Sequence, residues 1–249
     1  MTEIIAVVLG VAMLAAACVL VRHRYWPPDP DEEPREDVAE YISMMVGVLY
    51  ALILGLSLVS VWETRSSAQD HVQTEAGAAH QVYLLADGLP AARTEQVRTT
   101  MQAYVHHVVR AEFPEMVAGR PLGAEGWNLL HQVRAANRVP DSATPVQQAT
   151  VQEVLAQLST LDAARRGREA DALDSLSPTL WLGLIIGGAL TVAFMFMFGV
   201  KRNLTHVTMV MGLTALITFT VVLVYQLNQP FSGLLALDTS PFTRYFQGS

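Results

Sequence analysis

The chain has 249 residues, of which 51% are hydrophobic and only 16% charged, and its mean hydropathy is +0.31. It is more apolar than an average soluble domain, which indicates a membrane protein. A net charge of -7, with 16 Lys and Arg residues scattered along the chain, argues against nucleic-acid binding, which needs clustered cations. The single cysteine, Cys18, excludes an intramolecular disulfide.

Four apolar runs are long enough to cross a bilayer, at roughly residues 4–21, 42–62, 180–200 and 207–227. A spanning helix needs about 20 apolar residues, and none of the four runs contains Asp, Glu, Lys or Arg. The first run lacks the preceding basic residue of a secretory signal, so we expect it to be a retained helix. The sequence therefore predicts a multi-pass protein of the cell (plasma) membrane, with the lipid bilayer as a partner.

The region between the second and third runs is polar and shows helical rather than alternating periodicity. Four helices are predicted there, at about 63–86, 90–112, 123–138 and 145–173. Gly88 is expected to take the left-handed conformation that caps the first, and Pro114 to follow the end of the second. One stripe of the last helix is apolar and consists of Val151, Val154, Leu158 and Leu161. Ser177 is expected to cap the third spanning helix.

The predicted fold is an all-α membrane protein with four transmembrane helices in two hairpins and a helical domain inserted between helices two and three. Residues 1–62 form the first hairpin, with the acidic, proline-rich linker RHRYWPPDPDEEPRED inside it. Residues 63–177 form the helical domain, 178–228 the second hairpin and 229–249 a C-terminal strap.

Basic residues flank both predicted hairpin turns, with Arg22 and Arg24 at the first and Lys201 and Arg202 at the second. The positive-inside rule then places both turns in the cytoplasm, and the termini and the helical domain outside. The basic residues near the opposite ends of the spans are Arg65, Arg165, Arg166, Arg168 and Arg244. The numbers of basic residues on the two sides of the membrane are close. Because the Lys201-Arg202 turn is tight, we give its charges more weight and expect the helical domain to be extracytoplasmic.

Small residues recur every four positions on two of the predicted spans. They are Ser43, Gly47, Ala51 and Gly55 on the second, and Gly183, Gly187 and Thr191 on the third. Lipid gives helices no hydrophobic reason to associate, so such stripes indicate close helix packing. The packing is either within one subunit or between subunits, and a pore lining is the further alternative.

Hydroxyl residues at helical spacing mark the fourth span, with Thr214 and Thr218 as candidates to line a conduction path. The alternative is that each bonds to a carbonyl of its own helix, which is common for Thr in membranes. Because the spans contain no ionisable residue, a proton pump or an ion-coupled transporter is disfavoured and any conduction is expected to be passive.

Three histidines of the helical domain, His106, His107 and His131, form a weak zinc alternative with Glu112 or Glu115, without the ligand spacing of known sites. No nucleophile elbow, phosphate-binding loop or paired-carboxylate pattern occurs. We therefore expect no enzyme activity, no cofactor and no metal.

The stretch YQLNQPFSGLLALDTSPF follows the last span, and its Pro230 ends the helix because proline disfavours helix at the preceding residue. Phe231 and Phe242 are then expected either to pack the tail on the helical domain or a neighbouring subunit, or to anchor it at the membrane interface.

Four segments together carry a resemblance over nearly the whole chain: VGVLYALILGLSLVSVWE, YLLADGLP, LWLGLIIGGALTVAFMFMFG and QPFSG. With them the chain resembles the bacterial membrane family of unknown function called DUF4239, described as bestrophin-like.

A more distant resemblance is to the bestrophin anion channels. LGLSLVSVW, with Leu54, Ser57 and Val61, is similar to their pore-helix pattern. Asn228, Pro230, Phe231 and Gly233 resemble their Asn-Pro-Phe-Gly segment. The resemblance implies a homopentamer whose second spans line an apolar neck, and a cytoplasmic helical domain, opposite to the basic-residue count. Leu234-Leu235-Ala236-Leu237 stands where animal bestrophins have their acidic calcium clasp, so calcium gating is not expected.

The sequence leads to two alternative hypotheses about function. The first is an oligomeric, passively conducting, bestrophin-like ion channel, anion-selective if the resemblance extends so far, with inorganic ions as its partners. The alternative is a non-conducting membrane scaffold or sensor whose helical domain binds a partner.

Overall fold

The computed structural model describes residues 36–137, 144–197 and 204–246, together with isolated positions before residue 26. The first predicted span, at 4–21, falls mostly outside the described residues, as do the basic turn residues Arg22, Arg24, Lys201 and Arg202. Every regular element in the described ranges is helical. Among the described residues, three helices are long and apolar enough to cross a membrane, in the segments Tyr41–Gly88, Pro178–Met195 and Val207–Leu227.

The chain divides into two compact units. The membrane unit comprises Met1–Trp62 and Ser175–Asn228, and the helical unit comprises Glu63–Asp174 and Gln229–Ser249. The long helix α2 (Glu36–Leu85) contributes to both.

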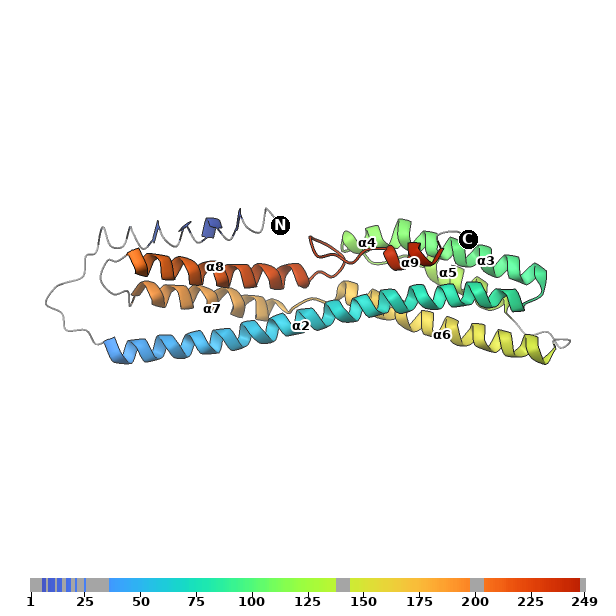
Figure 1. Ribbon diagram of the computed structural model, residues 1–249, viewed down its shortest axis with the longest axis horizontal. Helices are drawn as coiled ribbons and strands as arrows, with labels where there is room; N and C mark the ends of the chain where they lie inside the picture. The colour runs from blue at the N-terminus through green and yellow to red at the C-terminus, as the bar shows by residue number, and fades with distance from the viewer. Residues whose placement is uncertain are drawn as a thin grey trace. The chain divides into compact units, whose positions relative to one another are not determined.

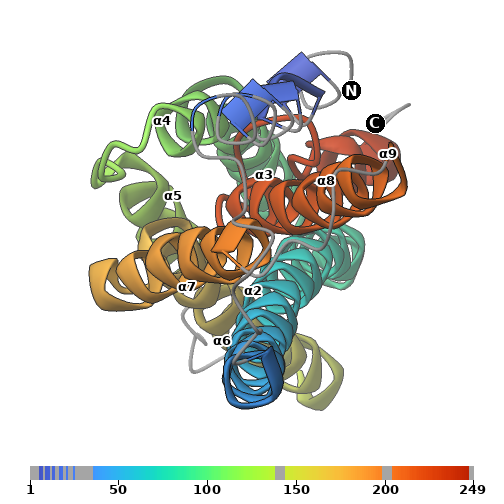
Figure 2. The ribbon, with the colours of Figure 1, turned by 90° about the vertical axis from the view of Figure 1, so that its left-hand side faces the viewer.

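In the membrane unit, α7 (Pro178–Met197) and α8 (Leu204–Leu227) lie side by side, and the first part of α2 packs with them (Figures 1 and 2). Ser177 caps α7 as predicted, since its Oγ accepts a hydrogen bond from the Leu180 amide at 3.3 Å. The core of this unit is a cluster of buried side chains, Val61, Leu184, Val224 and Leu227.

In the helical unit, the second part of α2 packs with α3 (Ala91–His107), α5 (Glu125–Ala136) and α6 (Pro145–Leu173). Helix α6 has the predicted bounds, with a capping box between Thr144 and Gln147 at its start. The predicted apolar stripe of α6 is confirmed, since all four of its residues are buried: Val151, Val154, Leu158 and Leu161.

Two helix ends differ from the predictions. Gly88 does not adopt the left-handed conformation, because α2 ends in the 3-10 turn Ala86–Gly88. There the Thr94 hydroxyl donates to the Ala86 carbonyl at 2.8 Å and to the Leu89 carbonyl at 3.1 Å, which supplies the hydrogen bonds of a cap.

Pro114 does not terminate the second helix of this unit. A π-helical turn, Val108–Glu112, follows α3, and α4 (Phe113–Val117) continues through the proline. Pro114 lies in the first turn of α4, where its missing N–H costs no helical hydrogen bond.

Candidate functional site

The predicted small-residue stripe of α2 lies on a face that the described residues leave uncovered. Ala51 and Gly55 are exposed, and Ser43 and Gly47 are half-buried. A Cβ atom added at Gly47 or at Gly55 would meet no heavy atom within 4 Å. Within one copy of the chain, nothing among the described residues uses the closeness that these glycines allow.

A neighbouring face of α2 packs inside the membrane unit. Tyr50, Ser57 and Val61 are 4%, 4% and 3% exposed, and Leu54 packs against the core cluster. The Ser57 hydroxyl donates to the carbonyl of Ile53 in its own helix at 2.8 Å. In a single copy, the side chains of Leu54, Ser57 and Val61 therefore pack in the membrane unit.

Two neighbouring glycines of α7 accommodate Tyr50. A Cβ at Gly187 would lie 2.6 Å from Cδ2 of the Tyr50 ring, and one at Gly188 would lie 2.9 Å from the Tyr50 hydroxyl. The aromatic ring thus fits against the α7 backbone only because both positions lack a side chain. Gly183, by contrast, meets nothing within 4 Å. The predicted α7 stripe therefore packs at Gly187 and is open at Gly183.

The candidate threonines differ in their hydrogen bonding. Thr191 donates to the Gly187 carbonyl and Thr218 to the Thr214 carbonyl, both at 2.8 Å. These two hydroxyls follow the alternative of bonding within their own helix. Thr214 is 3% exposed, and its hydroxyl has no partner among the described residues.

The segment after the last span is fixed at both of its ends. In the membrane unit, Asn228 Oδ1 accepts a hydrogen bond from the Leu176 amide at 2.7 Å. In the helical unit, the Leu237 amide donates to the Pro230 carbonyl at 2.8 Å, and the Arg65 guanidinium donates to the Leu235 carbonyl at 2.9 Å. Between them, Gly233 has a φ of 85°, which favours glycine.

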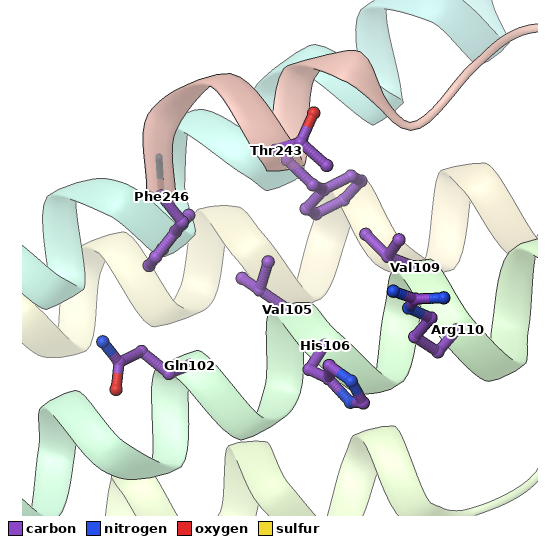
Figure 3. A pocket seen from close by; sticks show the side chains of 8 residues that line it. Gln102, Val105, His106, Val109, Arg110, Thr243 and Phe246 are labelled. Atoms are coloured by element: carbon purple, nitrogen blue, oxygen red, sulfur yellow. The ribbon is translucent and has the colours of Figure 1, made fainter. Parts of the chain in front are cut away.

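Aromatic packing then holds the tail on the helical unit, as in the first of the two alternatives given for Phe231 and Phe242. Phe231 and Phe242 are 3% and 0% exposed, and their ring centroids lie 5.9 and 6.1 Å from that of Phe113. Helix α9 (Ser240–Phe246) places Thr243 and Phe246 near α3 (Figure 3). A cavity of about 600 Å³ lies there, and its lining includes Gln102, Val105, His106, Val109 and Arg110.

The histidines of the zinc alternative are not brought together. His106 and His131 are exposed, while His107 Nε2 lies 3.5 Å from Glu112 Oε1. In the part of the chain that the structure describes, no three His, Cys, Asp or Glu side chains form a group suited to a metal ion.

A buried charge cluster in the helical unit, made of Glu75, Tyr104, Glu112, Arg165 and Arg168, was not predicted. Arg168 binds both oxygens of Glu75, at 2.5 and 2.9 Å, and reaches Glu112 at 2.7 Å. Arg165 binds both oxygens of Glu112, at 2.9 and 2.6 Å. The Tyr104 hydroxyl donates to Glu75 at 2.5 Å. Two carboxylates therefore neutralise two guanidinium groups that are 0% exposed.

The electrostatics of the charge cluster follow from burial and pairing. Burial acts to raise the pKa of the Glu112 carboxyl, but the hydrogen bonds and charges of Arg165 and Arg168 outweigh it, so the pKa lies below its ordinary value. Burial, with the Glu75 charge, raises the pKa of Tyr104 well above its ordinary value. The cluster thus holds an ionised Glu112 carboxylate and a neutral tyrosine, and it ties α2 to α3, the π-helical turn and α6.

Periodicity was the signal that would have revealed this cluster. The apolar stripe of α6 continues through Arg165 and Arg168 with the same spacing of three and four, and Glu75 follows Ala68 and Val72 on α2. A charged residue at a core position of such a stripe predicts a buried, paired charge. Gly126 of α5 is also part of the arrangement, because a Cβ there would clash with the Glu112 carboxylate and lie 2.5 Å from Arg165 Nη1.

Comparisons with known proteins agree with this architecture. The family model of the Bestrophin-like domain matches residues 9–242. No curated protein matches the chain. A crystal structure of a mutant bacterial bestrophin homologue from Klebsiella pneumoniae is similar in fold, with a TM-score of 0.69 and 14% identity, covering 96% of this chain and 95% of that one. The chain therefore belongs to the Bestrophin-like family.

Proposed function

We propose that the chain is one subunit of an oligomeric ion channel, in which the membrane segments of α2 from several copies surround a central path. We propose a homopentamer and anion selectivity, following the resemblance to bestrophin anion channels. Conduction is passive, because no apolar run contains an Asp, Glu, Lys, Arg or His that would couple ion movement to a proton or a second ion.

The uncovered stripe of α2 is the observation that carries this proposal. Glycine in a helix interior weakens the helix and gains nothing when it faces lipid. Its benefit is close approach of another helix, and no described residue makes that approach at Gly47 or Gly55. A second copy of the same chain, approaching with its own membrane unit, supplies the missing contact.

One copy offers little that would hydrate an ion. The hydroxyls of Ser57, Thr191 and Thr218 are already bonded to carbonyls of their own helices. The path therefore lies between copies, where exposed positions of α2 from each subunit form a ring.

For the side of the membrane, we propose that the helical unit is extracytoplasmic, on the strength of the basic residues at both predicted turns. The test uses a Cys18→Ser background with a cysteine at His131, which is exposed on α5. Labelling of intact cells by a membrane-impermeant maleimide is expected. Labelling only after the cells are opened would place the unit in the cytoplasm.

The channel itself is tested by flux from liposomes that contain the purified full chain, with chloride, nitrate, sodium and potassium in parallel. Anion flux that falls sharply in Gly55→Leu, together with loss of the oligomer, is expected because leucine fills the stripe. The matched control is Ser60→Leu, at an exposed position of α2 outside the stripe. An intact oligomer without flux would favour the scaffold or sensor, whose helical unit binds a partner.

A further inference from the structure

Two buried hydroxyls of the membrane unit lack a hydrogen-bond partner among the described residues. They belong to Tyr50 of α2 and Thr214 of α8, which are 4% and 3% exposed. A buried hydroxyl without a partner is costly, and in native structures each such group calls for an explanation. Ser57, Thr191 and Thr218 in the same unit do have partners, so the chain has ways to satisfy hydroxyls here.

Both hydroxyl residues line one cavity of about 550 Å³ in the membrane unit. Its walls come from α2, α7 and α8, with positions of the first apolar run also contributing. The remaining lining is largely apolar, and Leu184, Val192, Ile217 and Val221 are representative. No Asp, Glu, Lys, Arg or His is among the described residues that line it, so the cavity does not suit a charged ligand.

The Tyr50 ring is held in place before any ligand arrives. It lies against the backbone of α7, where Cβ atoms at Gly187 and Gly188 would lie within 2.6 Å of the ring and 2.9 Å of its hydroxyl. A phenol that is fixed by backbone contacts is a preorganised hydrogen-bond donor. Its hydroxyl is also near Ile217, one turn of α8 beyond Thr214, since a Cβ at Gly188 would contact both.

We propose that this cavity binds an uncharged, membrane-soluble molecule with an apolar body and one hydroxyl or carbonyl oxygen, which bonds to Tyr50 and Thr214. A single water, with about 30 Å³ of liquid volume, does not fill the space and finds few polar partners. The cavity volume of about 550 Å³ is within the range of small-molecule binding sites.

Depth in the membrane narrows the ligand class further. Tyr50 is nine residues from Tyr41 and twelve from Trp62, which corresponds to about 14 and 18 Å along a helix. The ester oxygens of a phospholipid lie at the interface, and its acyl chains bring no oxygen to this depth. A long-chain alcohol or ketone dissolved in the membrane does reach it.

The proposal is tested with the full chain in nanodiscs and the photoreactive alcohol 3-azioctanol, with adducts located by mass spectrometry. Adducts are expected on residues that line the cavity, and competition by 1-octanol but not by octanoate. Tyr50→Phe and Thr214→Val should each reduce labelling roughly fivefold, the effect of losing one hydrogen bond. The control is Thr220→Val, whose hydroxyl donates to its own Leu216 carbonyl at 2.9 Å.

Unchanged labelling in the Tyr50→Phe, Thr214→Val double variant would overturn the proposal, as would equal competition by octanoate or no cavity adduct at all. Tyr50→Phe keeps the ring that packs on Gly187, so this variant retains the fold. A second readout is the melting temperature, which 1-octanol should raise in the parent chain and leave unchanged in the double variant. Neither labelling nor the melting temperature depends on ion flux. A failure of the ligand proposal can therefore be distinguished from a failure of the channel proposal.

Discussion

The polar side chains of the two units form different kinds of hydrogen bond. In the membrane unit, Ser57, Thr191 and Thr218 bond to carbonyls of their own helices, and the helices then pack through glycine and apolar side chains. In the helical unit, Glu75 and Arg168 form ion pairs across separate elements.

The difference follows from the surroundings of each unit. A spanning helix needs hydrogen bonds that exist before it meets its neighbours, because lipid supplies none. A water-exposed unit can bring charges from distant segments together, and their pairing then fixes how its helices fit. Substitutions in the helical unit should therefore be far more disruptive than loss of a hydroxyl in the membrane unit.

The largest effect is expected from Arg168→Met. It leaves the Glu75 and Glu112 carboxylates buried with one cation fewer, which should lower the free energy of unfolding by about 3–5 kcal/mol. Chemical denaturation of the full chain, with hydrogen exchange of α5 and α6 peptides, measures the loss. Arg166→Met is the matched control, since Arg166 is exposed on the same helix. Equal losses in the two variants would show that the ion pairs contribute nothing.

Gly126→Ala ranks second. The added methyl group would clash with the Glu112 carboxylate and the Arg165 guanidinium, so we expect a loss of about 1–3 kcal/mol from overpacking. Gly123→Ala serves as the comparison, because a Cβ there meets nothing within 4 Å. The midpoint temperatures of thermal unfolding are compared between the two variants. Identical midpoints would mean that α5 does not pack tightly against the charge cluster at Gly126.

Acid should weaken the helical unit. The pKa of Glu112 in the folded chain lies below the ordinary 4.5, so its contribution is fully present above that value and is lost as the pH falls through the folded pKa. Stability measured from pH 7 downwards should fall below about pH 4.5, and the fall should be shallower in Glu112→Gln. The same dependence of stability on pH in the parent chain and in Glu112→Gln would exclude Glu112 as a source of the acid sensitivity.

The smallest effect is expected in the membrane unit from Ser57→Ala. The Ser57 hydroxyl donates to the Ile53 carbonyl of its own helix, so its removal should change stability by about 0.6 kcal/mol or less. Thermal unfolding in nanodiscs provides the measurement. A loss as large as that of Gly126→Ala would contradict the contrast between the units.

Much of the helical organisation was predictable from the sequence. Apolar runs predicted α7 and α8, and the apolar stripe that begins at Val151 predicted α6. The left-handed conformation expected at Gly88 was wrong, because α2 ends in a 3-10 turn whose Ala86 carbonyl accepts a hydrogen bond from the Thr94 hydroxyl.

The charge cluster was missed because Arg165 and Arg168 were counted only as basic residues near the ends of the spans. Their positions on the apolar stripe of α6 indicated burial, but their partners Glu75 and Glu112 come from distant segments. Periodicity identifies a core position, whereas the identity of the partner depends on how the helices pack in three dimensions.

The subunit number of the full chain in lipid nanodiscs tests the central claim most directly, by native mass spectrometry with particle class averages. The account predicts a closed ring of about five copies around an axis, because the stripe of α2 needs a neighbouring copy to cover it. A monomer, or a dimer without an axial path, would contradict it.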